Sequence, residues 1–104
     1  MPNTPHDPGT VGVARVAIFD EPPDLRPDDD RRAHSLYELL RSLPGFLGGY
    51  YLHEQSSGRL ISLTVWESAE RLEAAERAVR ERPVSDQRGI RPSRVERWLV
   101  DARL

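Results

Sequence analysis

The sequence predicts an α+β fold, a ferredoxin-like β-α-β-β-α-β domain built on a four-stranded antiparallel sheet. Three observations favour it. Strand-like and helix-like runs follow one another in the order strand, helix, strand, strand, helix, strand. The 104 residues suffice for one domain with its own core. Each strand-like run also carries apolar side chains on both of its faces, so neither face of the sheet is suited to water.

The first half of the domain begins after a short tail. Residues 1–10 hold three prolines and are expected to form a flexible N-terminal tail, which leaves 11–104 for the domain. The run VGVARVAIFD at 11–20 is rich in Val and Ile and predicts the first strand. Prolines interrupt the chain over 21–30. A helix follows at about 32–43, where apolar residues recur at the spacing of one buried helical stripe.

The second half predicts a hairpin, a helix and a last strand. Two strands are expected at about 47–54 and 59–66, joined by a Gln-Ser-Ser-Gly turn. A helix over 68–82 starts at a serine, which is a preferred N-cap residue, and ends before a proline. The final strand is RVERWLVDA at 94–102. Both helices of such a fold cover the same face of the sheet, so the other face would be bare in a monomer.

Side-chain alternation sorts each strand into two faces. In the strand at 59–66, Ile61, Leu63 and Val65 share one face, and Leu60, Ser62, Thr64 and Trp66 share the other. Leaving either set in water would create an apolar patch larger than soluble monomers usually carry. We therefore expect a face-to-face homodimer whose two sheets close into a barrel. The alternative is a monomer whose long loops fold over the sheet.

Composition excludes several classes of function. No apolar run approaches the roughly 20 residues that span a bilayer, and the N-terminus lacks the features of a secretory signal, so a cytoplasmic protein is expected. The chain has no cysteine, which removes disulfides and thiolate metal sites, and no metal-ligand spacing occurs. All 15 basic residues are Arg, but they alternate with acidic residues and the net charge is −2, which argues against nucleic-acid binding.

Three side chains are candidates for catalysis. His53 has an ordinary pKa of about 6.5, suited to proton abstraction, although it could equally lie idle at a strand end. Tyr51 shares its face and could donate to a developing oxyanion, or it could be a core tyrosine. Arg15 is a charge in the middle of the first strand. It could hold a substrate enolate or carboxylate, or it could form an ion pair with Glu96 or Glu67.

A second group of side chains is expected to bind a small aromatic or hydrophobic substrate. Ser62 and Thr64 share the face of Trp66, and hydroxyls beside an indole are typical of a ligand pocket with a few polar anchors. Tyr37, on the first helix, could reach the mouth of such a pocket. Phe19 ends the first strand with the parity of Arg15. Because the strand register is not fixed by sequence, grouping these residues on one face is a hypothesis.

The stretch at residues 44–76 resembles a known family and reads PGFLGGYYLHEQSSGRLISLTVWESAERLEAAE. It has a Pro-Gly-aromatic turn after the first helix, a Gly-rich entry to the next strand, and Val-Trp-Glu-Ser at the corner before the second helix. These features resemble the antibiotic biosynthesis monooxygenase-like family of dimeric α+β barrels. The resemblance covers about 11–102. It identifies the fold better than the reaction, because this superfamily hosts several chemistries.

The resemblance implies a cofactor-independent monooxygenase-like enzyme. The best-known members oxidise aromatic polyketide intermediates with O2 and without flavin, haem or metal. A phenol or anthrone loses a proton, and the resulting carbanion passes an electron to O2, so the protein supplies a base, an anion-stabilising dipole and a dry cavity. In relatives this cavity lies between the sheet and the helices, and Trp66 matches a tryptophan that lines it. The implied enzyme needs no cofactor.

The sequence departs from the family pattern at two functional positions. Haem-degrading relatives use an Asn on the first strand and a His on the second helix, and this chain has neither, so haem degradation is not expected. The Asn that some polyketide oxygenases use for substrate enolisation is also missing. Two alternatives therefore remain beside the monooxygenase. One is a cyclase or isomerase that uses the same pocket, and the other is a non-catalytic, small-ligand-binding dimeric accessory protein.

Overall fold

The computed structural model describes residues 11–20, 29–83 and 91–104. The predicted tail at 1–10 lies outside the described residues, as do parts of the predicted loops. The elements in chain order are β1 (Gly12–Phe19), α1 (Asp29–Ser42), β2 (Phe46–His53), β3 (Leu60–Trp66), α2 (Ala69–Arg80) and β4 (Arg94–Val100). The predicted order of strands and helices is confirmed.

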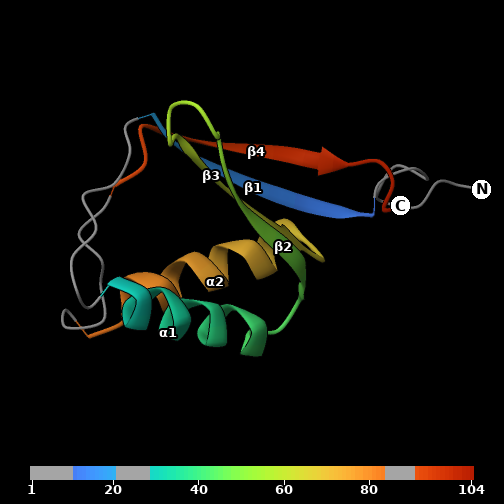
Figure 1. Cartoon of the computed structure of the whole chain (residues 1–104). Coiled ribbons are helices and arrows are strands. Elements are labelled where there is room, and N and C mark those ends of the chain that lie inside the picture. Colours follow the sequence, from blue (N-terminus) through green and yellow to red (C-terminus); the bar gives the residue numbers. More distant parts are fainter. Residues whose placement is uncertain (1–10, 21–28, 84–90) are drawn as a thin grey trace, which may run out of the picture.

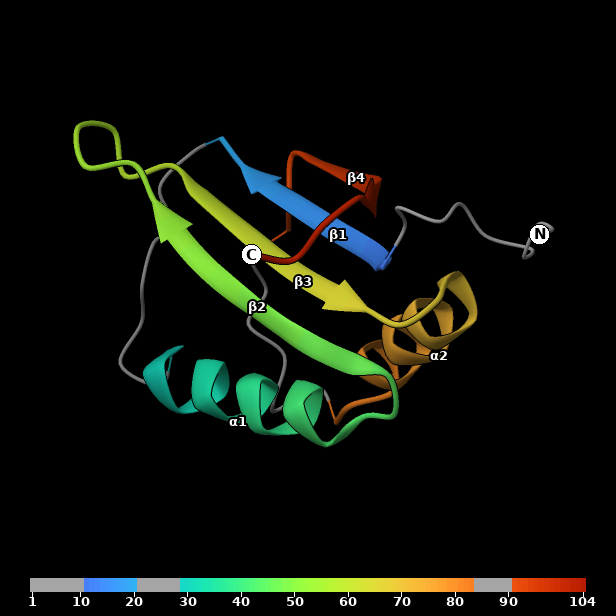
Figure 2. The ribbon, with the colours of Figure 1, turned by 90° about the vertical axis from the view of Figure 1, so that its right-hand side faces the viewer.

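The four strands form one antiparallel sheet in the order β2-β3-β1-β4 (Figure 2). Both helices lie on the same side of this sheet, and the opposite side carries none of the described elements (Figure 1). This arrangement is the predicted α+β, ferredoxin-like fold. None of the described helices has the length and apolar character needed to cross a membrane.

Glycine is required where α1 turns into β2. Gly45 has φ +87°, a left-handed conformation that residues with a Cβ rarely adopt. A Cβ at this position would lie 2.6 Å from the side chain of Arg71 on α2, so the turn also packs tightly against the second helix. The backbone amide of Glu67 donates to the carbonyl oxygen of Gly45, at 2.8 Å. The Pro-Gly turn therefore stops α1 and ties it to the corner between β3 and α2.

The core lies where the start of α2 meets the end of β3. Ser68 is the N-cap of α2, and its hydroxyl accepts a hydrogen bond from the backbone amide of Arg71 at 3.2 Å. This cap directs Leu72, which is fully buried, and Ala75 onto Trp66. The partly buried residues packed around this cluster are Val13, Leu40, Leu43 and Phe46.

The face of the sheet without helices, hereafter the open face, is apolar and exposed. Tyr50 and Trp98 are 68% and 58% exposed, and Leu52, which shares the face of Tyr50 on β2, is also exposed. The Trp98 indole donates to Glu96 Oε1 at 3.0 Å, and Arg94 Nε donates to the same carboxylate. These two hydrogen bonds hold the pKa of Glu96 below its ordinary value of 4.5, and the bond from Trp98 has the larger effect. The open face thus has the bare apolar character that alternation predicts.

Candidate functional site

A cavity of about 310 Å³ lies between the sheet and the two helices. Its volume is at the lower end of the range of small-molecule sites, which is roughly 300–1,000 Å³. The sheet contributes Arg15, Tyr51, Ser62, Thr64 and Trp66. The helices contribute Leu36 and Leu40 from α1, and Leu72, Ala75, Glu76, Val79 and Arg80 from α2. The cavity therefore combines a largely polar floor with a helical wall that is apolar apart from Glu76 and Arg80.

The strand register explains why the floor residues meet. Arg15 of β1 lies opposite Thr64 of β3. Tyr51 of β2 lies opposite Ser62 of β3 on the other side of that strand. Because residues paired across strands project to the same face, these four side chains and Trp66 share the helix-covered face. The structure thus brings together five of the residues that the sequence singles out, while their roles stay predictions.

Trp66 closes one end of the cavity. It is 1% exposed, and its ring lies edge-on to Phe46 with centroids 5.2 Å apart. Its indole Nε1 donates to Thr64 Oγ1 at 2.9 Å, which satisfies the only polar atom of a buried side chain. This bond uses one acceptor site of the Thr64 hydroxyl and leaves its proton available. The Ser62 side chain also borders the cavity and is equally buried, so both hydroxyls can meet a ligand.

Arg15 forms an ion pair with a helix rather than with a strand. Its Nε donates to Glu76 Oε2 at 3.0 Å, and the two side chains are 30% and 21% exposed. The prediction that Arg15 would pair with Glu96 or Glu67 is therefore wrong. Glu96 lies opposite Val16 and so points to the open face, while Glu67 follows the last residue of β3. Glu76 projects from α2 directly over the helix-covered face, where Arg15 emerges.

A second arginine completes this ion-pair network. Arg97 of β4 lies beside Arg15 in the strand register. Its Nη2 donates to Glu76 Oε1 at 2.7 Å, and its Nη1 lies 3.5 Å from Glu73 Oε2. Each oxygen of the Glu76 carboxylate therefore has an arginine partner, and the network links β1, β4 and α2 beside the cavity.

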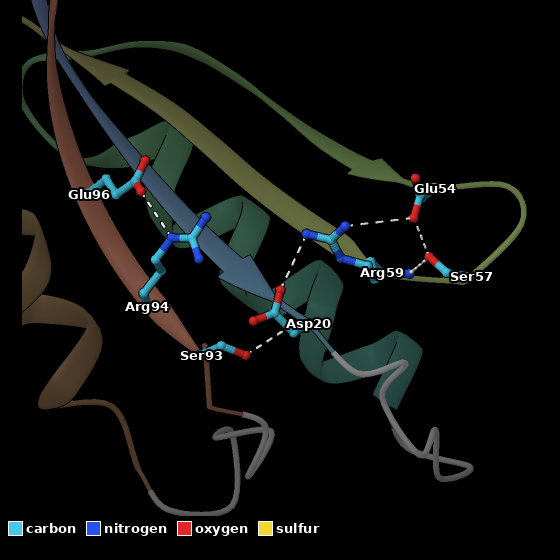
Figure 3. Close-up of polar contacts among 7 residues, drawn as sticks. All are labelled: Asp20, Glu54, Ser57, Arg59, Ser93, Arg94 and Glu96. Atoms are coloured by element: carbon cyan, nitrogen blue, oxygen red, sulfur yellow. Dashed lines mark hydrogen bonds and ion pairs between the residues drawn. The ribbon is translucent and has the colours of Figure 1, made fainter.

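His53 lies apart from this cavity. It is the last residue of β2, it is exposed, and it borders a separate hollow of about 220 Å³ at the β2–β3 hairpin. The hairpin is fastened by Arg59, whose Nη2 donates to Asp20 Oδ1 at 3.3 Å and whose Nη1 lies 3.9 Å from Glu54 (Figure 3). Ser57 bonds to the same Glu54 carboxylate.

Two further predicted residues lie near the cavity without lining it. The centroid of the Tyr37 ring lies 4.8 Å from that of Tyr51 and 5.9 Å from that of His34. Tyr37 therefore packs against Tyr51, which lines the cavity. Phe19 ends β1 opposite Leu60 and is half-buried, farther along the sheet than the cavity extends.

Sequence reasoning missed the two charged residues on the helical wall, Glu76 and Arg80. The signal was present, because they continue the face of α2 that carries Leu72, Ala75 and Val79 at helical spacing. The alternating acidic and basic run of α2 is, however, also what a solvated helix looks like. Only the packing of α2 on the sheet distinguishes the cavity-facing charges from the solvated ones.

The donor atoms around the cavity suit an organic ligand better than a metal. Within 11–20, 29–83 and 91–104, no group of three His, Cys, Asp or Glu side chains could hold a metal ion. Among the described residues that line the cavity, Tyr51 is the only side chain of a type that commonly ligates haem iron. Tyr51 projects from the sheet, beside Tyr37, whereas no described lining residue of the two helices is of a type that binds haem iron. The residues present therefore fit haem poorly.

A scan against family models finds no match to this chain, and a search of curated proteins by sequence finds none. Solved structures do match. A haem-degrading protein from Mycobacterium tuberculosis is 19% identical, with a TM-score of 0.61, over 91% of this chain and 97% of that one. SnoaB from Streptomyces nogalater, described as a cofactor-independent oxygenase, is 18% identical, with a TM-score of 0.52, over 89% and 91%.

The third match is the protein PA3566 from Pseudomonas aeruginosa. It is 12% identical, with a TM-score of 0.59, over 92% of this chain and 98% of that one. At these identities the likeness concerns the fold, and all three matches extend over nearly the whole length of both chains. The chain therefore has the α+β fold of these structures, which is the fold that its resemblance to the antibiotic biosynthesis monooxygenase-like family implies.

Proposed function

We propose that the protein is a cofactor-independent monooxygenase that oxidises a small aromatic or enolisable substrate, of the polyketide type, with O2. The observation that carries this proposal is that one cavity is lined by the guanidinium of Arg15, the phenol of Tyr51, the carboxylate of Glu76 and the hydroxyl of Ser62. Apolar side chains of the two helices line the same cavity. The fold shared with a protein described as a cofactor-independent oxygenase supports it. So does the set of lining residues, which suits an organic ligand.

The proposed reaction converts a methylene flanked by aromatic rings into a carbonyl. Removal of one proton gives an enolate with carbanion character. The enolate passes one electron to O2, and the substrate radical and superoxide combine into a peroxide anion. Protonation gives a hydroperoxide, which loses water as the remaining C–H proton leaves. The balance is CH2 + O2 → C=O + H2O, so no external reductant is needed.

Each lining group has a place in this reaction. The bonds of Arg15 to described residues use Nε alone, so its two Nη groups can face the enolate oxygen. Tyr51 borders the same space and can donate to that oxygen. Glu76 is the one carboxylate among the described lining residues. Each of its oxygens keeps a second lone pair beside the one that accepts from an arginine, so Glu76 is assigned the proton. Leu36, with the rest of the apolar wall, keeps water from the carbanion.

We further propose that the working unit is a homodimer formed through the open face. Its exposed aromatic side chains, Tyr50 and Trp98, alternate with the cavity-facing Tyr51 and with Arg97, so they point away from the described helices. Apolar aromatic groups in such a position are typical of protein interfaces. A second copy would cover them while leaving the cavity, on the other side of the sheet, accessible from its own mouth.

Oxygen uptake with 1,8-dihydroxyanthrone tests the activity. The protein is expected to accelerate uptake above the spontaneous rate, with one O2 consumed per anthraquinone formed and with no effect of a chelator. Arg15→Met is expected to lower kcat roughly tenfold to a hundredfold, because a hydrogen bond to a charged group contributes about 1.5–3 kcal/mol. His53→Ala, which changes a residue outside the cavity, serves as the matched control and is expected to stay within about twofold of the parent.

Other outcomes would overturn the proposal. A ring-closed or isomerised product formed equally well under nitrogen would favour the cyclase or isomerase. Tight binding of the anthrone without turnover would favour the accessory protein. If His53→Ala abolished the reaction while Arg15→Met left it intact, the assignment of the cavity would be wrong.

A further inference from the structure

The described charges around the cavity do not balance. Among the residues that the structure describes, three charged side chains line it: Arg15, Glu76 and Arg80, the last of them exposed. The ion-pair network beside it contains Arg15 and Arg97 as cations and Glu76 and Glu73 as anions, so it is neutral as a whole. Arg80 stands outside this network. The cavity therefore carries one positive charge that the network does not compensate.

The geometry of α2 explains why Arg80 has no carboxylate partner on its own helix. Glu76 lies one helical turn before Arg80, a spacing at which Glu and Arg commonly pair. Both oxygens of Glu76 are, however, already engaged, one by Arg15 and the other by Arg97. No residue that the structure describes forms an ion pair with Arg80, although the lining of the cavity includes it. Its guanidinium is available to a ligand.

Arg80 lies at the end of the cavity opposite the buried indole. Leu72, which packs on Trp66, is in the first turns of α2, and Arg80 is its last residue. Eight residues of α-helix extend about 12 Å, so Leu72 and Arg80 are offset along α2 by roughly the length of a fused aromatic ring system. A ligand can place its rings against Trp66 and Leu72 and an acidic group beside Arg80.

We infer that Arg80 forms a subsite for a carboxylate, so that the preferred ligands of this cavity are aromatic acids. This inference rests on the proposed function, because it names the substrate class of the same cavity. Arg is suited to the task, since its planar fork pairs with a carboxylate through two parallel hydrogen bonds. The carboxylate is present before and throughout the reaction. Arg80 therefore strengthens binding of substrate and transition state equally and lowers KM without raising kcat.

Calorimetric titration with 2-naphthoate and 2-naphthamide tests the subsite, because the two probes share their rings and differ in charge. The parent protein is expected to bind 2-naphthoate about tenfold more tightly than 2-naphthamide, in low salt. Arg80→Gln is expected to remove this preference and to leave the Kd of 2-naphthamide unchanged. Arg77→Gln is the matched control: it removes the same charge from the same helix at a position that does not line the cavity.

The outcomes separate the two proposals. If Arg80→Gln retained the preference, or if the parent bound both probes equally, the carboxylate subsite would be wrong while the cavity would still be a site for aromatic ligands. If Arg77→Gln lost the preference as fully as Arg80→Gln, the effect would be long-range attraction and the subsite would again be wrong. If neither probe bound, the proposed function would fall together with the subsite.

Discussion

Replacing Trp66 with alanine is expected to lower the free energy of unfolding by about 3–5 kcal/mol, the usual range for a buried aromatic residue. Trp66 is 1% exposed and packs against Leu72 and Phe46. Its removal leaves Thr64 without the indole that donates to its hydroxyl. The void would also merge with the cavity, so the variant is expected to lose most of its affinity for aromatic ligands.

Urea denaturation, followed by circular dichroism, measures this change. Trp66→Phe is the graded variant, because it keeps a ring in place and removes the N–H, and it is expected to lose about 1–2 kcal/mol. The parent, Phe and Ala forms should therefore fall in that order of stability. A loss below about 1 kcal/mol for Trp66→Ala would contradict the placement of this side chain in the core.

The second large effect is expected on the open face. Substituting both Tyr50 and Trp98 with aspartate should raise the Kd of the proposed homodimer by at least about a thousandfold, because truncating an aromatic side chain that anchors an interface costs about 2 kcal/mol or more, and the new charges must also lose their hydration. Symmetry adds to this, since each substitution is present in both protomers and so enters the interface twice. Both side chains are largely exposed in the protomer, so the fold should survive.

Sedimentation velocity across micromolar concentrations measures this dissociation. The control introduces the same two charges elsewhere, as Ala69→Asp and Ala74→Asp, at exposed positions of α2. The control is expected to sediment like the parent, as a dimer, and the open-face variant as a monomer with an unchanged circular dichroism spectrum. A parent protein that sediments as a monomer would show that the proposed homodimer is wrong.

The fold and the two sets of alternating side chains within each strand could be predicted from the sequence because both depend on short-range patterns. Grouping Arg15, Tyr51 and Ser62 on one face was a hypothesis, since it needs the register that the strand pairing supplies. The order of elements predicts that both helices cover the same face, but not which set of side chains they cover.

Position along the sheet could not be predicted in the same way. His53 has the same parity as Tyr51, but its pairing with Leu60 places it at the hairpin end, beyond the cavity. The partner of Arg15 was missed for a related reason. Glu76 reaches Arg15 only because of how α2 is rotated over the sheet, and that rotation depends on side-chain packing between distant segments, which no local pattern encodes.

The central claim is that ligands enter the cavity under the helices, and the two tryptophans of the chain report on it. Trp66 closes the cavity, whereas Trp98 lies on the open face, and each indole N–H gives its own NMR signal. Spectra of 15N-labelled protein are recorded during titration with 2-naphthamide, with Trp98→Phe to assign the signals. We expect a saturable shift of the Trp66 signal and a constant Trp98 signal. A shift of the Trp98 signal alone would place the ligand on the open face and contradict the claim.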